Sequence, residues 1–157
     1  MLAEEVGELL KSKGQTIALA ESCTGGKLGD MITEASGSSD YFLGGVVSYS
    51  NQAKMELLGV DKSTLDVKGS VSKEVALQMA AGARKKLHAD IGVGTTGIAG
   101  PTGGTKTKPV GLVYIAVSSD KTAVCTRNLF KGSRHDVKMH SAVKALEMVR
   151  EFLLKSG

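Results

Sequence analysis

Apolar positions along the first third of the chain alternate between helical spacing and short continuous runs. Residues 2–13 carry apolar side chains at helical spacing and stop at Gly14, which predicts a helix. The apolar run at 16–20 predicts a short buried strand. We expect the next helix to begin with Thr24 as its cap and to stop near 36–37.

The same alternation continues through the middle of the chain. Residues 42–49 predict a second strand, and 53–58 predict a short helix. Ser72 is the expected N-cap of a longer helix that ends near His88. A third strand is expected at 91–95.

The last third predicts a hairpin followed by a helix. Strands at 110–118 and 122–130 are separated by only 119–121, so they should pair antiparallel. A long helix is expected over about 134–154. Helices alternating with strands before a terminal hairpin predict an α/β fold, in which a mixed, mostly parallel five-stranded sheet has helices on both faces.

Composition and charge favour one domain that binds a small ligand. The 157 residues are 41% hydrophobic, which is enough for one core, so we expect a single domain over 1–157. The net charge of +4 comes from 20 basic and 16 acidic residues that are scattered along the chain, and Trp is absent. This pattern disfavours a nucleic-acid surface and is compatible with a small anionic ligand.

The N-terminal residues do not resemble a secretion signal. Glu4, Glu5 and Glu8 occupy the region where such a signal needs basic residues. No apolar run approaches the roughly 18 residues of a membrane span. We therefore expect a cytoplasmic protein without membrane contact, in which Cys23 and Cys125 are free thiols.

The segment AESCTGG at 20–26 is the strongest candidate for chemistry. It places Ser22 where an apolar strand gives way to the glycine-rich start of a helix. The backbone N–H groups of Thr24, Gly25 and Gly26 are the expected unpaired donors there, and such donors favour bound anions and developing negative charge. Ser22 is therefore either a nucleophile or an ordinary turn serine.

A lysine after the second strand could activate this serine. Tyr49 and Lys54 begin and end the segment YSNQAK, and both could project toward the sheet edge that carries Ser22. To act as a base near neutral pH, a lysine must have its pKa lowered from about 10.4 by roughly three units. Lys54 could instead be a solvated helix lysine, and Lys27 is the rival base.

The glycine-rich segment 97–109 should be a loop, and we interpret it as a ligand-binding loop rather than a flexible surface loop. The preceding GVGTTG, 92–97, matches a dinucleotide fingerprint, but no helix can follow it, so we reject that interpretation. Arg134 should open the last helix and could hold a phosphate or carboxylate, or could be a surface arginine. The expected polar lining of the loop consists of Thr95, Gly100, Thr102, Gly103 and Gly104.

The histidines do not suggest a metal site. His88 ends a predicted helix, while His135 and His140 lie five residues apart on another and so on different faces. No close-spaced Cys and His ligand pattern is present. We expect neither a metal nor a cofactor.

Five motifs in one order resemble the CinA C-terminal domain family: AESCTGG, GGVVSYSNQAK, GSVSKEVALQMAAG, GIAGPTGGTKTKPVGLVYIA and FKGSR. They cover most of the chain. The resemblance implies a stand-alone, three-layer α/β/α domain with a mixed sheet. Members similar to this chain, which also carry the name competence- and damage-inducible protein, are nicotinamide-nucleotide amidohydrolases, which convert nicotinamide mononucleotide and water to nicotinate mononucleotide and ammonia without a metal.

The resemblance also implies residue roles. Ser22 matches the nucleophile, Lys54 the lysine base and Tyr49 a site tyrosine. Arg134 matches the family's basic position after the Phe-x-Gly motif, and the residue before it is Ser133, where the family often has an aspartate. Supporting residues for substrate binding are Glu21, Thr24, Gly25 and Gly26.

Two functions remain open from the sequence. One is deamidation of nicotinamide mononucleotide, with amide hydrolysis of another small substrate as a variant. The other is a non-catalytic nucleotide-binding or partner-binding module, which a Lys54 ammonium more than about 5 Å from the Ser22 hydroxyl would favour. We also expect a homo-oligomer, because Tyr41 and Phe42 could form an exposed apolar surface for self-association.

Overall fold

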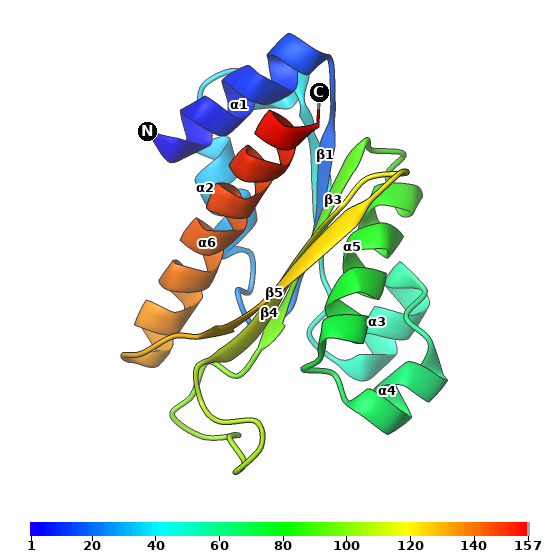
Figure 1. The fold of residues 1–157 in the computed structure, drawn as a ribbon, viewed down its shortest axis with the longest axis vertical. Helices are drawn as coiled ribbons and strands as arrows, with labels where there is room; N and C mark the ends of the chain where they lie inside the picture. Colours follow the sequence, from blue (N-terminus) through cyan, green and yellow to red (C-terminus); the bar gives the residue numbers. More distant parts are fainter. Residues whose placement is uncertain (157) are drawn as a thin grey trace.

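The computed structural model describes residues 1–156 and has three layers, with one sheet between two groups of helices (Figure 1). The strands are β1 (Ile17–Glu21), β2 (Phe42–Val47), β3 (Ile91–Gly97), β4 (Leu112–Ser118) and β5 (Ala123–Leu129). The helices are α1 (Leu2–Lys13), α2 (Lys27–Thr33), α3 (Asn51–Leu58), α4 (Lys62–Lys68), α5 (Lys73–Lys86) and α6 (Arg134–Lys155), with a 3₁₀ turn η1 (Ser38–Asp40).

The sheet is mixed, with strand order β2-β1-β3-β4-β5. β1 pairs parallel with both β2 and β3, whereas β4 pairs antiparallel with β3 and β5. Four strands therefore run in one direction and β4 runs in the other. Both the mixed sheet and the terminal hairpin confirm the sequence prediction.

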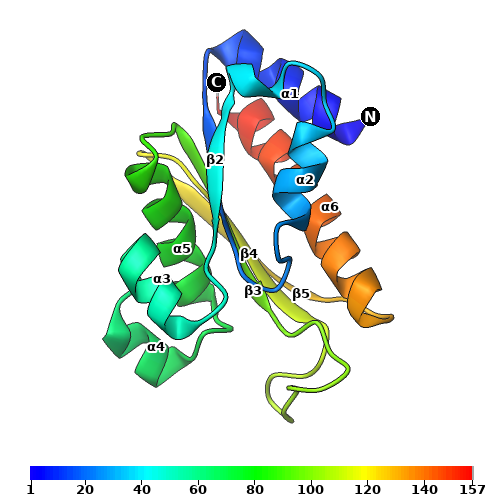
Figure 2. The same cartoon turned by 180° about the vertical axis from the view of Figure 1, so that it is seen from behind.

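Helices cover both faces of the sheet. α1, α2 and α6 lie on one face, and α3, α4 and α5 lie on the other (Figures 1 and 2). Side chains of a strand alternate between its two faces, so Leu19 of β1 joins the core under α1 and α6, while Ala18 and Ala20 join the core under α5. Both faces of β1 are buried, which explains its continuous apolar run.

Glycines of GVGTTG allow α5 to pack closely on β3. A Cβ at Gly92 would lie 2.0 Å from the Ala80 carbonyl oxygen, and one at Gly94 would lie 2.5 Å from that of Ala76. A side chain is therefore excluded at both positions. These glycines serve contact between strand and helix, in agreement with the rejection of a dinucleotide fingerprint.

Several predicted element boundaries shift in the structure. β1 lies one residue later than expected, and β2 ends at Val47 rather than at 49. α4 was not predicted, because its short sequence KSTLDVK lacks an apolar periodicity and buries only Leu65. Thr24 does not cap α2, which begins at Lys27 with Gly26 as its N-cap.

Tyr41 does not form the exposed surface that the sequence suggested. Its side chain is only 2% exposed and belongs to the core. The ring packs over α1 at Gly7, where a Cβ would collide with the tyrosine hydroxyl. Phe42 is partly buried against the same core.

Both cysteines, Cys23 and Cys125, are free thiols. Within residues 1–156, no helix combines the length and apolarity that crossing a membrane requires.

Candidate active site

The candidate site lies where β1 and β3 end. In the register of these parallel strands, Glu21 stands opposite Thr95, so Ser22 follows directly beside Thr95. The Ser22 N–H donates to the Thr95 carbonyl oxygen at 3.1 Å. The chain leaves β1 toward β2 on one side and returns to β3 on the other, and such a switch point at the carboxyl ends of strands is the usual ligand site of open α/β sheets.

Ser22 and Lys54 form a close pair at this position. The Lys54 Nζ lies 3.0 Å from the Ser22 Oγ. Ser22 is 7% exposed, and Lys54 is 1% exposed. Two polar groups that are distant in sequence are thus brought together and almost completely removed from water.

α3 and the end of β2 position the lysine. The Ser50 hydroxyl caps α3 by accepting from the Ala53 N–H, which fixes the first turn of the helix that carries Lys54. The Lys54 Nζ donates to the carbonyl oxygens of Ser48 at 2.8 Å and Tyr49 at 3.2 Å. β2 ends at Val47, so the next two carbonyls turn to the amine instead of continuing the strand.

These three contacts determine where the lone pair of a neutral amine must point. A neutral amine has two N–H donors and one lone pair, whereas a carbonyl oxygen can only accept. The carbonyls of Ser48 and Tyr49 take both donors of the neutral form. The lone pair of Lys54 then faces Ser22, whose hydroxyl can donate its proton to it.

The surroundings also favour the neutral form of the amine. Burial lowers the pKa of Lys54 from 10.5 to about 8, and the opposing influence of the Cys23 thiol is smaller. Desolvation penalises a charge that has no carboxylate partner. Lys54 is therefore suited to act as a base close to neutral pH. Within residues 1–156, the Lys27 side chain forms no hydrogen bond with Ser22, whereas that of Lys54 does.

Cys23 is not a competing nucleophile. Its side chain points into the core, where it is 6% exposed. Burial raises the pKa of the Cys23 thiol to about 12, so the reactive thiolate is disfavoured. This orientation agrees with the expectation from its neighbour Ser22.

Glu21 occupies one of the three amides that the sequence predicted to be free, together with two more at the start of α2. Its Oε1 accepts from the N–H groups of Gly26 at 3.2 Å and Leu28 at 3.0 Å, and its Oε2 accepts from Gly29 at 3.0 Å. The Gly25 N–H donates to the Ser22 carbonyl. The prediction of a free helix N-terminus at Gly25 and Gly26 is therefore wrong, because a buried carboxylate caps α2 instead.

Two other N–H groups remain available next to the serine. Among the described residues, those of Cys23 and Thr24 donate to no carbonyl or carboxylate oxygen. The Thr24 hydroxyl is held by Thr95, with 2.8 Å between their Oγ1 atoms. Donors fixed beside a nucleophile can stabilise an oxyanion.

Arg134 joins the glycine loop to the end of β2. Its Nη1 donates to the Gly100 carbonyl oxygen at 2.8 Å, and its Nη2 donates to the Tyr49 hydroxyl at 3.1 Å. Tyr49 is 61% exposed, so its ring lies at the rim of the site. A guanidinium has five N–H donors, which leaves further donors of Arg134 for an anionic ligand.

The outer part of the glycine loop lies apart from the pair. Thr102, Gly103 and Gly104 are exposed. Within residues 1–156, no hydrogen bond links them to Ser22 or Lys54. The segment between β3 and β4 projects from the body of the molecule (Figure 1). Only Gly100, at the base of the loop, is tied to the site through Arg134.

Lys138 of α6 was not predicted from the sequence as part of the site. Its Nζ would lie 3.5 Å from a Cβ at Gly25, which places a second cation beside the serine loop. Residues four apart share a helix face, so the spacing between Arg134 and Lys138 was the available signal. Within residues 1–156, no three His, Cys, Asp or Glu side chains gather as a metal site.

Comparison with known proteins finds relatives of the whole chain. The model of the CinA C-terminal domain matches residues 1–153. A CinA-like protein of Trichormus variabilis is 51% identical over 156 residues, which is 98% of this chain and 38% of that protein. The chain spans about a third of the length of the curated relatives it matches.

Solved structures share the whole fold. The competence/damage inducible protein CihA from Agrobacterium tumefaciens is 37% identical with a TM-score of 0.91, covering 99% of this chain and 97% of that one. The competence damage-inducible protein A (ComA) from Klebsiella pneumoniae subsp. pneumoniae MGH 78578 is 31% identical with a TM-score of 0.96, covering 99% and 97%.

Proposed function

Given that this chain belongs to the CinA C-terminal domain family, we propose that it is an amidohydrolase that converts nicotinamide mononucleotide and water to nicotinate mononucleotide and ammonia. One observation carries the proposal. The buried Lys54 amine lies 3.0 Å from the Ser22 hydroxyl and has carbonyl oxygens as its other partners. This is the arrangement that a serine nucleophile with a lysine base requires.

The first half of the reaction forms an ester with Ser22. Neutral Lys54 takes the hydroxyl proton while the Ser22 oxygen bonds to the carboxamide carbon, so the carbonyl oxygen becomes negatively charged. The N–H groups of Cys23 and Thr24, which donate to no carbonyl or carboxylate oxygen of residues 1–156, are the proposed main-chain donors for this oxyanion. Each such donor contributes about 3 kcal/mol to lowering a barrier of this kind.

The proton on Lys54 then completes the first half. The lysine ammonium donates it to the amide nitrogen as the carbon–nitrogen bond breaks, and ammonia leaves. In the second half, Lys54 accepts a proton from water, the hydroxide attacks the ester carbon, and the proton returns to the Ser22 oxygen as the acid is released. Protons and leaving groups balance without any other group.

Arg134 is the proposed anchor for the substrate phosphate. Its contacts with Gly100 and Tyr49 hold the guanidinium at the rim of the site while leaving donors unused. Lys138 adds a second positive charge next to Gly25. A mononucleotide held by its phosphate at this rim would direct its carboxamide toward Ser22.

The non-catalytic alternative is less compatible with this geometry. A binding module has no need for a desolvated lysine beside a serine, and burying an amine that has no carboxylate partner within residues 1–156 has a cost in stability. The Lys54 Nζ lies 3.0 Å from the Ser22 Oγ. A separation of more than about 5 Å would have favoured a role in binding alone. The buried pair therefore supports catalysis.

Ammonia release from nicotinamide mononucleotide tests the proposal. We expect turnover by the wild type and a loss of about a thousandfold or more in Ser22→Ala and in Lys54→Ala, because each removes one member of the pair. Ser39→Ala and Lys62→Ala are matched controls at exposed positions and should retain wild-type rates. An unchanged rate in Ser22→Ala would refute the nucleophile, and no turnover by the wild type would refute the substrate.

A further inference from the structure

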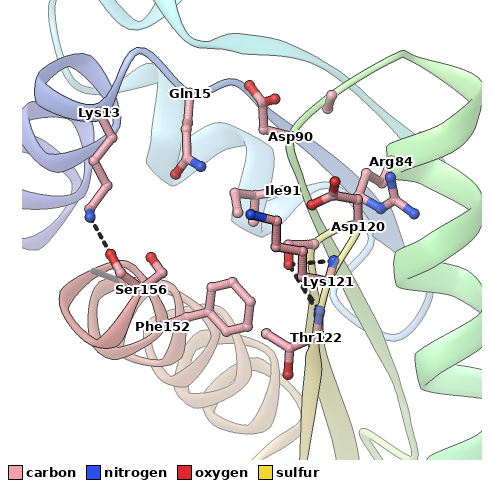
Figure 3. Close-up of a pocket in the computed structure, with 12 residues that line it drawn as sticks. Lys13, Gln15, Arg84, Asp90, Ile91, Asp120, Lys121, Thr122, Phe152 and Ser156 are labelled. Carbon is pink, nitrogen blue, oxygen red and sulfur yellow. Dashed lines mark hydrogen bonds between the residues drawn. The ribbon is translucent and has the colours of Figure 1, made fainter.

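A cavity of about 830 Å³ lies at the opposite end of the sheet from Ser22 (Figure 3). It is bounded by the starts of β1 and β3, the turn between β4 and β5, and the ends of α1, α5 and α6. Ligand pockets in proteins are usually about 300–1,000 Å³, so this volume could hold a molecule of nucleotide size. The residues of the proposed active site take no part in its lining.

Among residues 1–156, two buried polar atoms at this cavity have no hydrogen-bond partner. They are the Gln15 Oε1, which can only accept, and the Arg84 Nε, which can only donate. Both residues line the cavity. Buried polar groups are nearly always satisfied, and an exception needs an explanation. A ligand that offers one donor and one acceptor would satisfy both atoms.

The charges around the cavity favour an anion. Lys121 projects into the middle of the cavity in Figure 3, and within residues 1–156 it forms no ion pair. Lys13 is held by the Ser156 carbonyl. Asp90 is occupied by Thr16, whose N–H donates to it at 2.8 Å.

The remaining charged groups of the lining do not reverse this balance. Asp120 and Arg84 both line the cavity, but within residues 1–156 they form no ion pair. Within residues 1–156, the lining therefore holds three basic side chains, Lys13, Arg84 and Lys121, against two acidic ones, Asp90 and Asp120. Lys121 is the cation that points into the space.

Phe152 and Ile91 supply an apolar wall. Figure 3 shows the Phe152 ring facing the cavity below Lys121, with Gln15 reaching in from the opposite side. A flat ring system could lie against this wall while its edge donates to the Gln15 Oε1. The cavity thus combines a cation, an acceptor and an apolar surface that come from separate elements.

We propose that this cavity is a second ligand site, which binds a small organic anion that also carries an N–H donor and a flat ring. Lys121 and Arg84 donate to the anionic group, and the Gln15 Oε1 accepts from the N–H. AMP is a suitable probe because it combines a phosphate, a planar base and an amino group.

Amide chemical-shift titration of the full chain tests the site. We expect AMP to shift the amides of 119–122 in a saturable way, with a Kd of about 1 mM or below. Adenosine lacks the anion and ribose 5-phosphate lacks the N–H, so each should bind at least about tenfold more weakly. Absence of any response at 119–122 to about 5 mM AMP would overturn the proposal.

Variants separate this cavity from the active site. Lys121→Gln should weaken AMP binding at 119–122 by about tenfold or more, because one charged hydrogen bond is lost. Lys62→Gln removes an equal charge outside the cavity and should leave binding unchanged. Arg134→Gln should also leave these shifts intact. If Arg134→Gln abolishes them while Lys121→Gln does not, the ligand belongs to the Ser22 site and the second site is refuted.

Gln15→Met provides an independent readout. It removes the unpartnered oxygen, so we expect a higher Tm without ligand, by a few degrees, together with weaker AMP binding. A Tm and an affinity both equal to those of the wild type would show that water satisfies this oxygen and would contradict its role in binding.

Discussion

Lys54 determines what this site can do at the scale of single residues. Its amine is buried, faces the Ser22 hydroxyl and has carbonyl oxygens as its other partners. Burial lowers its pKa to about 8, and no carboxylate of residues 1–156 pairs with the amine to offset the cost of burying its charge. The same burial that destabilises the ammonium therefore provides a base.

Activity should follow the proton on Lys54. Since the neutral amine is the reactive form, kcat/KM for nicotinamide mononucleotide should rise about tenfold per pH unit below about 8 and level off above it. Lys54→Arg should stay inactive up to about pH 10, because a guanidinium does not lose its proton there. A rate independent of pH between about 6 and 9 would contradict Lys54 as the base.

Arg134 should contribute to binding of the substrate phosphate and not to the reaction at the amide. Arg134→Gln should raise KM for nicotinamide mononucleotide by about tenfold or more, which is the effect of losing charged hydrogen bonds. Nicotinamide riboside lacks the phosphate, so its kcat/KM should change little. Lys131→Gln, a nearby exposed position, is the matched control. Equal losses with both substrates would mean that Arg134 supports the site through Gly100 and Tyr49 instead.

Residue identities in the site were largely predictable, but their partners were not. Ser22 follows an apolar strand and Lys54 follows the next one, so the sequence already places both at one sheet edge. The burial of Lys54 depends on Ser48 and Tyr49 leaving β2, which no local pattern reveals. Glu21 stands beside Ser22 in the sequence, yet its hydrogen bonds reach up to eight residues further along.

At the scale of elements, α2 is held to β1 by one side chain. Glu21 is the last residue of β1, and its carboxylate accepts three N–H groups at the start of α2. This cap replaces the side-chain cap that Gly26 lacks. The turn that presents Ser22 is thereby fixed at both ends.

Glu21→Gln should weaken this cap and loosen the serine turn. An amide offers one accepting oxygen, and its NH₂ faces N–H donors, so we expect a loss of about 1.5–3 kcal/mol in stability. We also expect a lower kcat, because Ser22 is less firmly placed. Thermal unfolding and turnover check this, with the exposed Asp30→Asn of the same helix as control. Equal behaviour of the two variants would contradict a special role for Glu21.

Elements with a clear hydrophobic periodicity or a short connection were predicted correctly, and elements without such a pattern were not. α6 and the β4–β5 hairpin match the sequence expectation closely, because a long helical periodicity and a short connection leave few alternatives. α4 escaped prediction because seven mostly polar residues bury a single leucine. α2 begins later than expected because the first residues after Ser22 form a turn that Glu21 organises.

At the scale of the whole molecule, the burial of Lys54 affects stability. Its folded pKa of about 8 lies below its ordinary value of 10.5. Between these values the unfolded chain binds more protons than the folded one, so the free energy of unfolding contributed by Lys54 rises with pH across that window. Below about pH 8 the cost of burial is fully present.

A methionine at this position should remove that dependence. We expect the stability of Lys54→Met relative to the wild type to fall by about 2 kcal/mol between pH 7 and about pH 9.5, as the wild type loses its buried charge. Denaturant unfolding of both proteins at each pH measures this. A constant difference across the range would mean that the folded state does not perturb Lys54.

The proposed mechanism depends most directly on the protonation of one amine, that of Lys54. NMR of the chain with ¹⁵N-labelled lysine can follow the Lys54 Nζ through a pH titration, with Lys54→Met identifying its signal. We predict a midpoint of about 8, well below the roughly 10.4 of a lysine model compound in water. A Lys54 signal with a midpoint of about 10.4 would contradict the proposed base and, with it, the serine–lysine mechanism.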